Sequence, residues 1–157
     1  MFSKTTMMYR WIWMNVVPAI LILNGLYDIL CGCCILWQCE TIQLFVYLGS
    51  LHPTMFIEPN HSNHPVIRRL LAYWLFTYGF VRLFAGMTEE FYLDIVAAIT
   101  YFLEAFCYEY ERWIGQTVIH EKTTFVSVFS FILGVIVICR PVGVYGYGNL
   151  GSHKKEY

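Results

Sequence analysis

Long apolar runs dominate the chain and are separated by short polar segments. The first run extends from Trp11 to Trp37, with Asn24 and Asp28 as its polar exceptions. A helix of this length, rising about 1.5 Å per residue, measures roughly 40 Å, which exceeds the roughly 30 Å hydrocarbon core of a bilayer. We therefore expect this segment to cross a membrane with a tilt, with a kink near Pro18 or with one end in the interface.

The remaining apolar runs predict three more spans, at about 66–87, 90–114 and 123–145. A turn of only two or three residues joins the second span to the third, which predicts that these helices are antiparallel neighbours. One apolar patch, 41–51, is too short to cross and predicts an interfacial or protein-packed helix. Residues 146–157 read as a polar tail. The predicted fold is all-α: one integral membrane four-helix bundle with a short interfacial helix after the first span.

Composition supports a bilayer as the solvent. Apolar residues make up 58% of the 157 residues and charged residues only 13%, against roughly 45–50% and about 25% in soluble domains. The net charge of −1 argues against a nucleic-acid partner. The expected partners are the lipid bilayer and other membrane proteins. Basic residues are divided almost evenly between the two sides, so the sequence predicts no orientation.

Polar side chains form a stripe on the third predicted span. Charged groups inside spans are costly and usually face protein or water. The members of the stripe recur at helical spacing: Glu90, Asp94, Tyr101, Glu104, Tyr108 and Glu111.

Basic residues of the second predicted span can face this stripe when the hairpin folds at Thr88. Matching depths from the turn predicts that Arg82 pairs with Asp94 or Glu90. At the far end, Arg68 or Arg69 is predicted to pair with an acidic residue of the third span: Glu104, Glu109 or Glu111. Such pairs would fix the register of the hairpin. The alternative is that one acidic group faces a ligand, a proton path or a partner subunit.

Catalytic and metal-binding patterns are sparse. His61 and His64, with Glu58 nearby, have the only metal-like spacing, and further ligands would be needed for a site. A solvated loop is the better interpretation, so no metal ion and no cofactor are predicted. The sequence lacks a G-x-S-x-G elbow, an H-E-x-x-H helix and a phosphate-binding glycine loop. We therefore predict no catalytic residue and expect a protein that is not an enzyme.

The cysteines of the first apolar run have two interpretations. Small packing residues inside a span are favoured, and a palmitoylation cluster at a membrane boundary is the alternative. The residues concerned are Cys31, Cys33, Cys34 and Cys39.

A motif in the second and third predicted spans resembles a known family. Trp74 follows Arg69 by five residues and Arg82 follows Trp74 by eight. With Glu109 late in the next span, this spacing resembles the core of the small four-span ergosterol-biosynthesis scaffold proteins of the endoplasmic reticulum. The family usually has a histidine where this chain has Ala105.

The resemblance covers about residues 66–135, with a looser match at 11–26. It implies a non-catalytic scaffold that tethers sterol C4-demethylation enzymes in the endoplasmic reticulum membrane, with the four matched residues as framework positions of the hairpin. One alternative is an accessory subunit of a large membrane complex, such as a respiratory complex of the mitochondrial inner membrane. Another is a small lipid- or sterol-binding enzyme or carrier that uses Glu104 or Glu109 in a bundle cavity.

Overall fold

The computed structural model describes residues 8–9, 11–37, 65–88 and 90–152, and the side chains among them up to Pro141. These ranges are helical except at residues 88, 90 and 116–119. The elements, in chain order, are η1 (Ile12–Val16), α2 (Val17–Trp37), α5 (Pro65–Met87), α6 (Phe91–Tyr110), η3 (Glu111–Gly115) and α7 (His120–Ser152). No strand occurs in the described ranges.

Within the described ranges, four helices are long and apolar enough to cross a membrane, in agreement with the four spans predicted from the sequence. Their candidate spans are Ile12–Trp37, Pro65–Met87, Phe91–Gly115 and His120–Pro141. The all-α prediction is therefore confirmed for the described part of the chain. The bounds of the first three candidate spans lie within one residue of the predicted limits, whereas the fourth begins three residues earlier than predicted. The predicted interfacial segment, 41–51, lies outside the described residues.

Helix α7 is longer than predicted. The sequence predicts a polar tail from Gly146, but the helix continues to Ser152 and includes Pro141. Glycine disfavours a helix by only about 1 kcal/mol relative to alanine, so a glycine-rich stretch weakens a helix without ending it. A glycine stops a helix most effectively at positive φ, and no described glycine has positive φ.

A π-helical turn precedes Pro18. In η1 the carbonyl of Ile12 accepts the backbone N–H of Val17, five residues later. Pro18 has no N–H to offer the carbonyl of Met14, and its ring crowds that carbonyl. The wider turn separates the two groups, so the irregularity predicted near Pro18 takes the form of a π turn.

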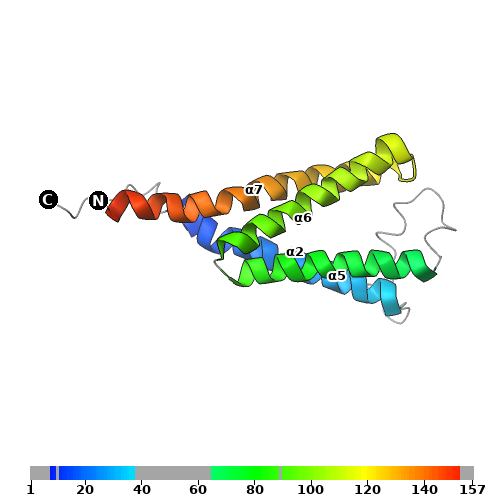
Figure 1. Cartoon of the computed structure of the whole chain (residues 1–157), viewed down its shortest axis with the longest axis horizontal. Coiled ribbons are helices and arrows are strands. Elements are labelled where there is room, and N and C mark those ends of the chain that lie inside the picture. Colours follow the sequence, from blue (N-terminus) through cyan, green and yellow to red (C-terminus); the bar gives the residue numbers. More distant parts are fainter. Residues whose placement is uncertain (1–7, 10, 38–64, 89, 153–157) are drawn as a thin grey trace.

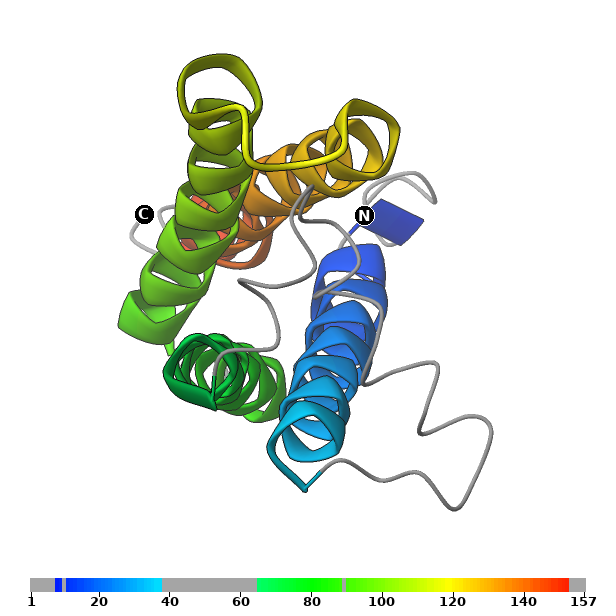
Figure 2. The same cartoon turned by 90° about the vertical axis from the view of Figure 1, so that its right-hand side faces the viewer.

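The helices pack mainly as two pairs. Helix α2 lies along α5, and α6 lies along α7, whereas α5 and α6 contact each other less although a short turn joins them. Figure 1 shows the two pairs meeting where α5 turns into α6 and diverging toward the other end. Figure 2 shows α2 and α7 on the same side of the bundle, where they contact each other only slightly.

Glycines bring the backbones of α2 and α5 together. A Cβ atom added at Gly25 would lie 2.6 Å from the carbonyl oxygen of Gly79, and one added at Gly79 would lie 2.9 Å from the carbonyl oxygen of Gly25. Such contacts are closer than carbon and oxygen atoms tolerate, so only glycine fits at either position. Small residues commonly allow membrane helices to approach in this way, because van der Waals contact drives their association.

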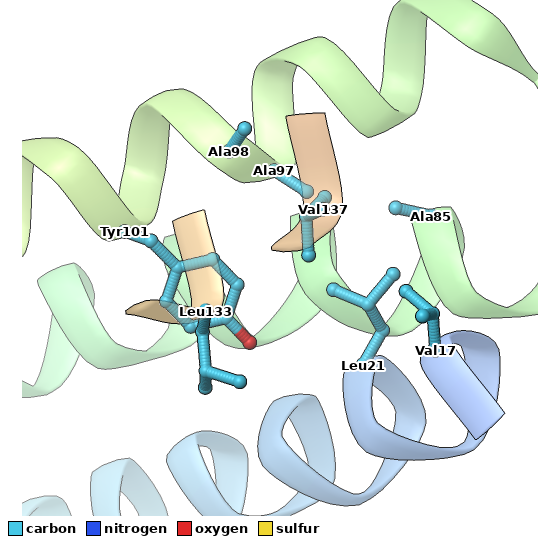
Figure 3. Packing of buried hydrophobic residues seen from close by; sticks show 8 residues of the cluster. All are labelled: Val17, Leu21, Ala85, Ala97, Ala98, Tyr101, Leu133 and Val137. Atoms are coloured by element: carbon cyan, nitrogen blue, oxygen red, sulfur yellow. The ribbon is translucent and has the colours of Figure 1, made fainter. Parts of the chain in front are cut away.

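Apolar side chains from all four helices fill the end of the bundle nearest the α5–α6 turn. In Figure 3 Leu21 of α2, Ala85 of α5 and Val137 of α7 point toward one another beneath α6. A second cluster lies between α2 and α5 and includes Cys31, Cys34, Ile35, Ala72 and Leu75. The packing interpretation of Cys31 and Cys34 is thereby confirmed, while Cys39 lies outside the described residues.

Candidate functional site

A buried polar cluster occupies the middle of the bundle and is centred on Arg82. The guanidinium of Arg82, with 1% of its side chain exposed, forms ion pairs of 2.7 Å with Asp28 and 2.6 Å with Glu104. Its Nε donates to the Thr100 hydroxyl at 3.2 Å. We call the following residues the Arg82 cluster: Asn24, Asp28, Arg82, Thr100, Tyr101, Glu104 and Ser130.

Helical spacing explains how α2, α5 and α6 supply most of the cluster. Asn24 and Asp28 lie one turn apart on α2, and Thr100 and Glu104 lie one turn apart on α6, so each pair shares a helix face. Arg82 on α5 lies between these two faces. An arginine fork suits this position because it donates from several nitrogens at once in a fixed plane.

Tyr101 adds a second kind of support to Arg82. The Tyr101 ring lies 3.8 Å from Cζ of Arg82, a cation–π contact. Its hydroxyl donates to Oδ1 of Asn24 at 2.6 Å, and Nη1 of Arg82 donates to the same oxygen at 3.3 Å. From α7, the Ser130 hydroxyl donates to Oε2 of Glu104 at 3.2 Å. The cluster therefore links all four helices.

A second buried ion pair lies at the end of the bundle near the α5–α6 turn. Nη1 of Arg140 on α7 is 2.7 Å from Oδ1 of Asp94 on α6. Arg140 also donates to the carbonyl oxygens of Ala85, at 2.9 Å, and of Thr88, at 3.1 Å. The last carbonyls of a helix lack intrahelical partners, and a cation is favourable there. Arg140 thus caps α5 while it fixes α7 to α6.

The predicted pairing of Arg82 with Asp94 or Glu90 is wrong. Arg82 binds Asp28 and Glu104, Asp94 binds Arg140, and Glu90 is the exposed N-cap of α6. Counting residues from the turn compares only the depths of backbone positions along the two helices. Helical side chains lean toward the N-terminus of their own helix. On antiparallel helices Arg82 therefore reaches away from the turn and Glu104 toward it, which closes the offset between them.

The acidic residues predicted to pair with Arg68 or Arg69 have other partners. Glu104 belongs to the Arg82 cluster. Oε2 of Glu109 lies 2.7 Å from Arg112 and accepts from Nε1 of Trp113 at 2.9 Å, both on the same helical surface. Glu111 and Arg69 also make local contacts. The Thr117 hydroxyl donates to Glu111, and Nε of Arg69 donates to the Pro65 carbonyl at 3.1 Å.

Three residues of these networks were not identified as partners from sequence. Asn24 and Asp28 stood out as polar exceptions in the first span, and Arg140 lies inside the predicted fourth span. The signal was present, because every charge inside a span needs a partner. Depth matching within the hairpin of the second and third predicted spans does not reveal these partners, because they lie on the first and fourth spans.

The framework residues suggested by the family resemblance lie in different surroundings. Arg82 is the centre of the buried cluster. The Trp74 ring packs against Tyr78 and Tyr108, with centroid distances of 5.6 and 6.4 Å. Arg69 and Glu109 make the local contacts given above. The structure therefore brings these four positions to no common site.

A cavity of about 770 Å³ opens between α2 and α7. Its polar floor is part of the Arg82 cluster, and its walls are mostly apolar. The residues that line it on α2 and α7 include Leu23, Tyr27, Phe125, Val126, Phe129 and Leu133, and Lys122 lies at the end where α7 begins. Slight contact between α2 and α7 leaves this space unfilled by side chains.

No group of three or more His, Cys, Asp or Glu side chains within the described ranges could hold a metal ion. His61, His64 and Glu58 lie outside those ranges.

No protein-family model, curated protein or solved structure matches the chain. The resemblance to the sterol scaffold family therefore stays a prediction from the motif alone.

Proposed function

We propose that this chain is a non-catalytic subunit that crosses a membrane four times and holds other membrane proteins together. The observation that carries the proposal is the internal use of the buried charges. Arg82, Asp28 and Glu104 bind one another across α2, α5 and α6, and Arg140 binds Asp94 across α6 and α7. Charges that are engaged in this way fix the arrangement of the helices, which is what a rigid scaffold requires.

The outer surfaces of the four helices are suited to lipid and to partner helices. Large apolar side chains are exposed along every helix, among them Leu70, Phe84, Tyr92, Phe106 and Phe131. A bilayer or a neighbouring membrane protein would cover such surfaces without a cost in free energy. Nothing about them calls for a nucleic-acid partner.

The sharpest version of the proposal follows from the sequence resemblance. In that version the chain tethers sterol C4-demethylation enzymes in the endoplasmic reticulum membrane. The second version has the same physical basis and a different location: an accessory subunit of a large complex, such as a respiratory complex of the mitochondrial inner membrane.

Affinity capture in a mild detergent would test the proposal. A tagged full-length chain would be purified from membranes, and co-purifying proteins would be quantified by mass spectrometry. The matched control is Arg82→Leu, because partners that recognise the folded bundle should be lost when the buried cluster is broken.

Each outcome of the capture experiment separates the versions. Stoichiometric, Arg82-dependent recovery of sterol C4-demethylation enzymes would support the sterol version. Recovery of respiratory-chain subunits would overturn that version and support the second. Recovery of no stoichiometric partner from either membrane would overturn the assembly role itself.

A further inference from the structure

We propose that the cavity between α2 and α7 binds one neutral amphiphile, with a hydroxyl head group at Asn24 and Glu104 and an apolar body along the two helices. The inference requires the helices to lie in a bilayer. It does not require a protein partner, so it can be tested independently of the proposed assembly role.

The size and lining of the cavity fit a lipid-like molecule. Its volume of about 770 Å³ lies within the roughly 300–1,000 Å³ typical of ligand pockets, which are mostly apolar with a few placed polar groups. Three lining side chains are strongly exposed: Leu23 at 68%, Phe125 at 72% and Phe129 at 47%. The cavity therefore opens sideways at these residues, where the tails of a surrounding bilayer would lie.

Asn24 supplies a hydrogen-bond donor to the floor. Its side-chain oxygen accepts from both Arg82 and Tyr101. An arginine can only donate, and it binds the same Asn24 atom as the Tyr101 hydroxyl, so that atom is fixed as the oxygen and the amide cannot flip. The Nδ2 group must point elsewhere, and it has no partner among the described residues. Asn24 lines the cavity and is half-buried, so Nδ2 can donate to an oxygen of a bound molecule.

Glu104 supplies an acceptor to the same floor. The hydrogen bonds from Arg82 and Ser130 both end on its Oε2 atom, and within the described part of the chain Oε1 accepts none. Glu104 also lines the cavity. A hydroxyl group can accept from Asn24 and donate to Glu104 at the same time, which neither an ether nor a carbonyl group can do.

The charges at the floor disfavour an acidic head group. Asp28 and Glu104 are two carboxylates that face one guanidinium, that of Arg82. An added carboxylate or phosphate would meet like charges in a medium of low dielectric constant, where repulsion is strong. Lys122 stands at the other end of the cavity, so an acidic amphiphile would bind in the reverse position and away from the floor. A neutral hydroxyl avoids both the repulsion and the reversal.

Photolabelling with matched probes would test this assignment. The purified full-length chain would be placed in phosphatidylcholine nanodiscs with probes that share one alkyl chain and one diazirine. The probes would differ only in the head group: an alcohol, its methyl ether, a carboxylic acid and a primary amine. We expect saturable labelling of α2 and α7 peptides by the alcohol. The concentration that gives half-saturation should be about tenfold lower for the alcohol than for the ether, because the ether cannot donate a hydrogen bond to Glu104.

Two tryptophan substitutions on α2 provide the structural control. Leu23→Trp would fill the opening of the cavity, whereas Leu26, which is also exposed on α2, does not line it. We expect Leu23→Trp to abolish saturable labelling and Leu26→Trp to leave it unchanged, with both variants folding as judged by thermal unfolding. Equal labelling by ether and alcohol, preferred labelling by acid or amine, or unchanged labelling of Leu23→Trp would each overturn the proposal.

Discussion

Arg82 and Asp28, 54 residues apart in the sequence, form a buried ion pair of 2.7 Å that joins α5 to α2. Both side chains are almost completely withdrawn from the surface, and the same guanidinium also binds Glu104 on α6. One arginine thus holds three helices. Its removal would leave two carboxylates without a counter-charge in the interior of the bundle.

Replacement of Arg82 by leucine should therefore be strongly destabilising. Removing one partner of a buried ion pair typically costs about 3–5 kcal/mol, because an uncompensated charge stays behind. We expect a loss of this size in the free energy of unfolding of Arg82→Leu, measured by titration of mixed micelles with a denaturing detergent. The control is Glu109→Gln, which affects the more exposed pair with Arg112 and should cost less than about 1 kcal/mol. Similar losses in the two variants would contradict the central role of Arg82.

The balance of charges predicts a difference between two acidic residues. Glu104→Gln leaves Arg82 with one carboxylate, that of Asp28, so the remaining pair is balanced. Asp94→Asn removes the carboxylate that binds Arg140 and leaves this buried cation with neutral amide and backbone carbonyl oxygens, including those of Ala85 and Thr88. We expect Asp94→Asn to lower the free energy of unfolding by on the order of 1–3 kcal/mol more than Glu104→Gln does.

Both acidic variants can be measured in the same micelle titration. If Glu104→Gln proves the more destabilising of the two, the excess of carboxylates at Arg82 is not what sets the stability of the cluster. Loss of a chemical activity in folded Glu104→Gln would argue for the enzyme or carrier alternative.

The four helices were predictable because their signal is local. An apolar run of about twenty residues can satisfy its backbone groups in a bilayer only as a helix or within a closed barrel. The runs ending near Trp37 and Met87 therefore gave the span limits almost unchanged. The stripe containing Asp94 and Glu104 was also predictable from helical spacing, and both residues are buried in the structure.

The partners of these charges were not predictable from spacing alone. Which helices pack together depends on close backbone approach at particular residues, such as Gly25 and Gly79, and on how far the helix pairs diverge. Within the hairpin alone, Asp94 is the acidic residue at the depth of Arg82. In the complete bundle Arg82 instead pairs with Asp28 of α2, as well as with Glu104. The cavity was unpredictable for the same reason, because it exists only where α2 and α7 fail to pack.

Pro18 should determine the π turn that precedes it. In Pro18→Ala the new N–H can bond to the carbonyl of Met14, so we expect residues 12–18 to become regular α-helix. Backbone chemical shifts and amide exchange rates in micelles would report the change. Pro65→Ala is the control, since Pro65 is the first residue of α5, where the missing N–H would have no helical partner in any case. A π turn that persists in Pro18→Ala would show that packing, and not the proline, produces it.

Gly25 should be the least replaceable glycine of the bundle, even by alanine. A Cβ atom there would lie 2.6 Å from the Gly79 oxygen and 2.7 Å from the backbone nitrogen of Leu83, neither of which can move without displacing α5. At Gly134 of α7 the nearest atom, at 2.8 Å, belongs to the Phe102 ring, a side chain that can turn aside. Overpacking typically costs about 1–3 kcal/mol, whereas an unobstructed Gly→Ala change in a helix gains up to about 1 kcal/mol.

We therefore expect Gly25→Ala to lower the free energy of unfolding by about 1–3 kcal/mol and Gly134→Ala to leave it nearly unchanged. Spin labels on the exposed faces of α2 and α5, at Leu30 and Tyr73, would show whether the helices separate. In Gly25→Ala the distance between the labels should increase, and in Gly134→Ala it should not. A stable Gly25→Ala variant with an unchanged distance would mean that α2 and α5 do not approach at this glycine. In that case the position of Asp28 beside Arg82 would need another explanation, because the close approach of these helices is what brings the two side chains together.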